Sequence, residues 1–203
     1  NQVAAMTSAQ IGALTSSQVQ AMTTAAVAAI QTTDLTALSA AVIGVLSTAT
    51  IAGLTTDQMA TLTSVQVSGL TTAQAAVLSS NQVAAIVTTG ITALSTGAVA
   101  ALSTTAVAAL TTNQVGVLST GQVQAFTTAD VAVLNTAQTV ALTSVQVGAL
   151  TTRQAAVLNT AQAAAIETND ITALSTAAVR ELSTAAEGAN PTDRGGVQRT
   201  KQI

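Results

Sequence analysis

Apolar residues close a repeating unit of eight residues along most of the chain. The closing residue falls at Met6, Leu14 and Met22 and recurs without insertion or deletion to Leu182, which makes 23 consecutive closures. With this residue as position eight, the octad reads T-[TS]-x-Q-V-x-A-L. Position two is Ser or Thr in 22 of the 23 octads between residues 7 and 190, with Ala40 as the exception, and position four is Gln in 12 octads and Asp in three. A fixed short period predicts a repeat architecture.

A weaker and longer similarity connects whole groups of octads. Residues 63–94 match 143–174 octad by octad, ending in VTTGITAL and ETNDITAL, and a related QTTDLTAL lies at 31–38. These copies are separated by seven and ten octads. We therefore expect that the array grew by duplication of octads without a fixed larger block.

A continuous helix does not suit this period. Eight residues at about 100° each advance roughly 800°, so the apolar positions rotate by about 80° per octad and form no stripe. Coiled coils keep their seam with periods of seven or eleven residues.

A series of separate short helices fits the pattern better. Ser or Thr followed three residues later by Gln is a capping box, which satisfies backbone N–H groups at the start of a helix. Each octad then predicts a helix of six or seven residues, and Asn135 and Asn159 are equally good N-caps. Stacked in a solenoid, such helices bury their fifth and eighth residues, and a small seventh residue lets them approach closely. The expected capping pairs include Thr7/Gln10, Thr71/Gln74, Thr111/Gln114 and Thr151/Gln154.

The competing interpretation is a β-solenoid. Thr and Val favour strands, and two or three octads could form one coil. Positions five and eight have opposite parity, however, so every octad would need a bend, and no Gly, Asn or Pro stands at a fixed place to make it. The sequence thus favours an all-α solenoid over residues 1–182. Residues 183–203 are expected to be a degenerate last repeat and a polar tail, since Glu187 and Asn190 replace apolar residues there.

The amino-acid composition argues against most classes of protein function. The chain has no His, Cys, Trp or Tyr, so catalytic thiols, Ser–His–Asp triads and the usual ligands of zinc and haem are missing. Five Lys and Arg in a chain of net charge −3 do not provide a nucleic-acid surface. Ser/Thr pairs interrupt the apolar residues too often for a membrane span of about 20 residues. We expect no enzyme, cofactor, metal site or nucleic-acid partner. The start at Asn1 suggests a processed product or an excerpt.

A few charged residues and the hydroxyl rows are the remaining candidates. Asp34, Asp130 and Asp170 share the fourth position and are expected to be helix-start carboxylates favoured by the helix dipole, although residues 167–170 form an oxygen-rich cluster. Arg153, Arg180 and Glu181 are expected to be surface charges. Rows of Ser and Thr could bind ice or glycans, but capping and turn formation already account for them.

The octads also resemble a known group of repeats. LTTAQAAVL (70–78), LTTNQVGVL (110–118) and LTSVQVGAL (142–150) are similar to repeats of very large secreted bacterial proteins that are often labelled haem-utilisation or adhesion proteins. The resemblance implies an extracellular or cell-surface role. The haem label finds no support in the residues, because only Met6, Met22 and Met59 could ligate iron.

These observations predict a structural protein that assembles with itself, as a fibre subunit or an adhesin stalk. Residues 1–152 contain only Asp34, Asp57 and Asp130 as charged residues, so charge repulsion hardly opposes packing between copies. The array also starts without a polar capping repeat, which repeat proteins normally need for solubility. The alternative is a module that binds ice or a glycan through its Ser/Thr rows.

Overall fold

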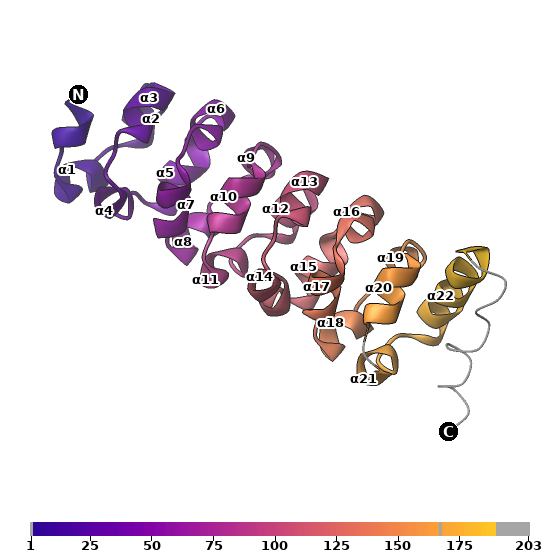
Figure 1. Ribbon diagram of the computed structural model, residues 1–203. Helices are drawn as coiled ribbons and strands as arrows, with labels where there is room; N and C mark the ends of the chain where they lie inside the picture. The colour runs from indigo at the N-terminus through magenta and orange to yellow at the C-terminus, as the bar shows by residue number, and fades with distance from the viewer. Residues whose placement is uncertain (1, 167, 190–203) are drawn as a thin grey trace. The chain divides into compact units, whose positions relative to one another are not determined.

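The computed structural model describes residues 2–166 and 168–189, which group into two compact units, residues 1–117 and 118–203. The described residues are helical and contain no strand (Figure 1). The predicted all-α solenoid is therefore confirmed, and the β-solenoid alternative is wrong.

Each octad supplies one short helix, and the helix numbers follow the octads. The N-terminal unit contains η1 (Val3–Ala5), α1 (Ser8–Gly12), α2 (Ser16–Gln20), α3 (Thr24–Ala28), α4 (Thr32–Leu35), α5 (Ala40–Val45), α6 (Thr48–Ala52), α7 (Thr56–Thr61), α8 (Ser64–Ser68), α9 (Thr72–Ala76), α10 (Ser80–Ala85), α11 (Thr88–Ile91), α12 (Thr96–Ala100), α13 (Thr104–Ala108) and α14 (Thr112–Val117). The C-terminal unit contains α15 (Thr120–Ala125), α16 (Thr128–Val133), α17 (Thr136–Val140), α18 (Ser144–Gly148), α19 (Thr152–Ala155), α20 (Thr160–Ala165), α21 (Thr168–Ile171) and α22 (Thr176–Ala189).

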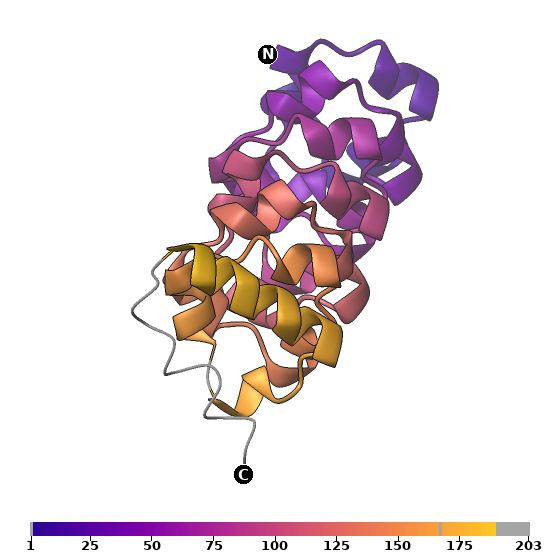
Figure 2. The ribbon, with the colours of Figure 1, turned by 90° about the vertical axis from the view of Figure 1, so that its right-hand side faces the viewer.

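Three octads, or 24 residues, make one turn of the solenoid in each unit. Every helix packs on the helix three octads earlier: α4 lies on α1, α5 on α2 and α6 on α3, and the pattern continues to α14. In the C-terminal unit α18 packs on α15, α19 on α16 and α20 on α17. Figures 1 and 2 show the helices of successive turns stacked within each unit. A turn therefore has three faces, and each face repeats every third octad.

Extended backbone at the junction between octads turns the chain. Leu62 closes one octad with φ −57° and ψ 129°, and Thr63 opens the next with φ −69° and ψ 158°. No described residue has a positive φ, so the corners need no glycine. This explains how the array bends at every octad without a fixed Gly, Asn or Pro.

Seven of the helices α1 to α21, for example α7 and α10, have the predicted length of six residues, and the others are shorter, with four or five. The difference arises because the last turn of each octad tightens. In α8, for example, the N–H of Leu70 donates to the carbonyl of Val67, a bond of the 3₁₀ type. In the shorter helices the seventh residue is thus a turn residue, whereas in α7 and α10 it is the last helical residue.

The core consists of the fifth and eighth residues, as predicted. Fifth residues such as Val67 and Val83 are completely buried, and eighth residues such as Leu70 and Leu78 are nearly so. From α7 onward, the Gln side chains at position four are buried with them. Burial of the glutamines was not expected from the sequence.

Helix α22 differs from the others. It continues through residue 182, where the sequence predicts the regular repeat to end, and packs on both α19 and α20. The charged tail residues after Ala189 lie outside the described part of the chain. No described helix is both long enough and apolar enough to cross a membrane.

Candidate functional site

The fourth-position glutamines form the most regular polar feature of the molecule. In α9, the N–H of Gln74 donates to Thr71 Oγ1 (3.2 Å), and the N–H of Thr71 donates to Gln74 Oε1 (2.8 Å). This is a complete capping box, as the sequence predicts. The pairs beginning at Thr7, Thr111, Asn135, Thr151 and Asn159 have the same geometry.

The amide nitrogen of the same glutamine has a second role. Gln74 Nε2 donates to the carbonyl oxygens of Ile43 and Leu46, both at 2.8 Å, which belong to the end of α5. Carbonyls at the end of a helix lack the usual donor four residues later, and here the Ile43 carbonyl also accepts the N–H of Leu46 in a bond of the 3₁₀ type. One Gln side chain therefore caps the start of its own helix and the end of a helix in the preceding turn.

This double contact recurs with a fixed register. The amide nitrogen reaches carbonyls 28 and 31 residues earlier, in bonds that are buried. It joins the turns of both units. The glutamines that make it include Gln58, Gln66, Gln74, Gln82 and Gln114 in the N-terminal unit and Gln154 and Gln162 in the C-terminal unit.

One signal in the sequence could have revealed this role. A capping box accepts Glu as readily as Gln, because both side chains supply the acceptor oxygen. Yet position four is Gln in 12 octads and Glu in none. Exclusive use of the amide indicates that its N–H groups also have acceptors.

The three aspartates at position four lie in the first turns of α4, α16 and α21, as expected for helix-start carboxylates. Asp130 replaces Gln in a capping box with Thr127. Asp34 accepts a hydrogen bond from Ser8, one turn earlier, and Asp170 accepts one from Ser144 in the same way. The structure does not gather these carboxylates into one site. Among the described residues, no three His, Cys, Asp or Glu side chains lie close enough to hold a metal ion.

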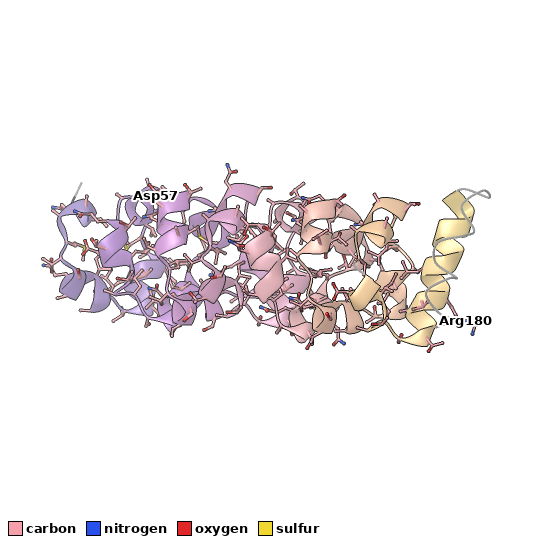
Figure 3. All side chains as sticks on the ribbon, turned by 60° about the horizontal axis from the view of Figure 1, so that its bottom comes forward. Asp57 and Arg180 are labelled. Carbon is pink, nitrogen blue, oxygen red and sulfur yellow. The ribbon has the colours of Figure 1, made fainter. Side chains whose placement is uncertain are left out.

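The few other charged side chains lie at the surface. Arg153, Arg180 and Glu181 are exposed, as expected. Figure 3 shows Asp57 on α7 and Arg180 on α22.

First- and second-position hydroxyls differ in their contacts. First-position residues such as Thr63 and Ser79 accept the N–H of the fourth residue, so the prediction that they cap helices is confirmed. Second-position residues lie toward the next turn instead. Ser80 Oγ, for example, donates to the carbonyl of Thr105 in the turn above (3.0 Å).

One face of the N-terminal unit carries only small apolar residues at positions three, six and seven, beside the Ser and Thr of positions one and two. It is formed by α3, α6, α9 and α12, and we call it the alanine face. At positions three, six and seven its residues are exposed or half-buried, whereas the corresponding positions on the other two faces include Asp57, Asn81 and Gln20. The alanine face consists of Ala25, Ala28, Ala29, Ala49, Ala52, Gly53, Ala73, Ala76, Val77, Gly97, Ala100 and Ala101.

The sequence analysis missed this face, because it found no block larger than the octad. The signal is present in every third octad, namely TTAAVAAI (23–30), STATIAGL (47–54), TTAQAAVL (71–78) and STGAVAAL (95–102). The period of three becomes visible only when the number of octads per turn is known.

Together, these features define a class of protein: an α-solenoid in which each octapeptide supplies one capped helix and glutamines join successive turns. The chain belongs to the ALTTAQ repeat family, whose model matches residues 1–24, 27–64, 83–120, 91–128, 123–160 and 163–189. No curated protein and no solved structure matches the chain. The family match concerns the repeat itself.

Proposed function

We propose that this protein is a structural component of the bacterial cell exterior that assembles with copies of itself, as a filament subunit or an adhesin stalk. The observation that supports this proposal best is the alanine face, an exposed apolar surface that extends over four stacked helices. Contiguous exposed apolar surface is typical of contact sites. The extracellular location rests on the resemblance to repeats of secreted proteins.

The chemistry of the alanine face suits contact between copies. Methyl groups and glycines let two backbones approach closely, and burying them costs almost no side-chain entropy. No charged residue lies on this face, so two copies can meet without desolvating or opposing charges. The same surface has no group that could act as a general acid, a general base or a nucleophile. We therefore propose no enzymatic activity.

The first test is direct observation of assembly. We expect the purified chain to form filaments or lateral assemblies at high concentration in negative-stain electron microscopy, and to sediment faster as its concentration rises. Dispersed monomers over the whole concentration range would contradict the proposal.

A charge-insertion variant identifies the surface that makes the contact. Three lysines on the alanine face, in the variant A25K/A49K/A73K, should suppress assembly, because like charges would face each other between copies. The matched control T33K/N81K/T105K places lysines at the same third positions of α4, α10 and α13. The control should assemble nearly as the wild type does. Equal effects of the two variants would show that net charge, and not this face, controls assembly.

A second candidate function is binding of ice or a glycan. It is favoured by Thr48, Thr72 and Thr96, which border the alanine face, are exposed and make no side-chain hydrogen bond within the described structure. Replacing these three with Val should abolish binding to ice or to a glycan array and leave assembly unchanged. If the wild-type chain binds neither, this alternative is excluded.

A further inference from the structure

The fourth position does not join all turns of the N-terminal unit in the same way. Helices α7 to α10 each begin with a glutamine whose amide nitrogen donates to carbonyls of the turn below. In the next three octads the fourth residues are Gly90, Ala98 and Ala106. None of these residues has a side-chain amide, so the turn formed by α11, α12 and α13 makes no such bonds to the ends of α7, α8 and α9.

Apolar contacts close this junction instead. Ala98 and Ala106 are completely buried, and a Cβ on Gly90 would lie 3.2 Å from Val67 Cγ2. The hydrogen bond from Ser80 to Thr105 does cross the junction, but it lies at the exposed surface where water competes for both groups. The amide bonds elsewhere reach carbonyls 28 and 31 residues earlier. By this spacing, Ala98 stands where a glutamine would donate to the carbonyls of Val67 and Leu70, and the alanine side chain has no donor.

We infer that the junction between residues 63–86 and residues 87–110 opens more readily than the junction between residues 39–62 and residues 63–86. Buried hydrogen bonds from the side-chain amides of three glutamines stabilise the latter junction, whereas across the former only Gln114 makes such bonds, to the carbonyls of Val83 and Ile86. The junction between residues 7–30 and residues 31–54, whose fourth residues Asp34, Val42 and Thr50 also carry no amide, is a second weak point of the N-terminal unit. Regions with fewer such bonds open locally at lower free energy than their neighbours. In a stalk, which is part of the proposed function, such a junction would let the array lengthen under tension before the turns that three glutamines join unfold.

Native-state hydrogen exchange of the whole chain, followed by mass spectrometry, tests the inference without reference to assembly. The amide protons of Val99 and Val107, bonded within α12 and α13, should exchange about 10- to 100-fold faster than those of Val67 and Ala75 in α8 and α9. Equal or slower exchange in α12 and α13 would overturn the inference. Failure of the chain to form filaments would contradict the proposed function but would not contradict this inference.

Two variants check the cause of the opening. Ser95 and Ser103 already cap α12 and α13 by accepting the N–H groups of Ala98 and Ala106, so the variant A98Q/A106Q restores complete capping boxes and the missing amides. It should slow exchange in α12 and α13 by about 10-fold, whereas A98E/A106E, which supplies no amide, should not.

The variant A98Q/A106Q adds atoms at two buried positions, so a variant that only removes atoms serves as an independent test. Q66A/Q74A removes amide bonds from α8 and α9, and should raise exchange in these helices to the rate of α12 and α13. If exchange in α8 and α9 stays slow in this variant, the amides do not control where the array opens.

Discussion

A single glutamine side chain links local and long-range structure in this array. The acceptor oxygen of Gln74 fixes the start of α9, and its nitrogen fixes the contact with the turn below. Both hydrogen bonds of the nitrogen are buried, and the side chain is only 2% exposed. Loss of a buried partner costs more than the net value of the hydrogen bond, because the group left behind remains desolvated.

The variant Q74E separates these two roles, because Glu keeps the acceptor oxygen but loses both donors. At pH 7 it should lower the free energy of unfolding by about 2–4 kcal/mol, measured by urea denaturation, since a charge then faces two carbonyl oxygens. Q18E is the matched control. Gln18 is exposed and forms a capping box with Thr15, so its replacement should change stability by about 0.5 kcal/mol or less. Equal losses would mean that the amide nitrogen contributes nothing.

The stability of Q74E should also depend on pH. Burial against carbonyl oxygens raises the pKa of the introduced carboxyl in the folded state above its ordinary value of about 4.3. The protonated carboxyl is therefore the form that the folded state favours. Below about pH 4.3 the deficit relative to the wild type should be smallest, and it should grow as the pH rises through the raised pKa. Urea denaturation at pH 4 and pH 7 measures this change, and a deficit that is the same at both would contradict it.

Individual helices depend on how closely their backbones approach one another. Gly69, at the seventh position after α8, lies against α5: a Cβ there would be 2.5 Å from the carbonyl oxygen of Ala40. A contact that short cannot be relieved by rotation of a side chain, so the backbones must separate. The expectation that small seventh residues permit close approach is confirmed at this site.

Gly69→Ala should therefore lower the free energy of unfolding by about 1–3 kcal/mol, because the added methyl group forces α5 and α8 apart. Gly97→Ala is the control within a helix. Its Cβ would meet the methyl carbon of Thr72 at 3.2 Å and Ser95 Oγ at 3.9 Å, both of them side-chain atoms, and the higher helix propensity of Ala offsets the closer contact. Its change in stability should stay within about 1 kcal/mol of zero. Thermal denaturation compares both variants with the wild type, and a neutral Gly69→Ala would show that the stack tolerates wider spacing.

Helices could be predicted from the sequence because their signals are local. Thr71 and Gln74 lie three residues apart, so the capping box is visible without any knowledge of the fold. The number of octads per turn could not be predicted in this way. It depends on the angle that extended residues such as Leu62 and Thr63 give to successive helices, and composition does not encode that angle.

The alanine face could not be predicted from the sequence for the same reason. Ala49 and Ala73 are 24 residues apart, and nothing in the sequence shows that they lie on neighbouring helices of one face. Low charge and an expected tendency toward self-assembly could be inferred from composition. The position of the surface through which copies would meet could not. Once a turn is known to hold three octads, the outward residues of α3, α6, α9 and α12 fall into one surface.

At the scale of the whole molecule, the three-octad turn makes the alanine face sensitive to the number of octads. The contacts between turns use backbone carbonyls, which every octad supplies, so the solenoid tolerates loss of octads. The set of helices that forms each face, however, changes when octads are lost. Removing one octad moves every later helix of the N-terminal unit to the preceding face, whereas removing three returns each later helix to its own face.

Two deletions test this argument. Deletion of residues 63–70 removes α8 and shifts α9 and α12 onto the face of α2 and α5, which splits the alanine face into two halves. Deletion of residues 63–86 removes three times as much chain but leaves α12 stacked on α6. Both variants should keep a helical far-UV circular dichroism spectrum. Only the shorter deletion should abolish assembly in sedimentation velocity, because contact between copies needs a continuous face. Assembly that survives the shorter deletion, or fails in both, would place the contact elsewhere on the molecule.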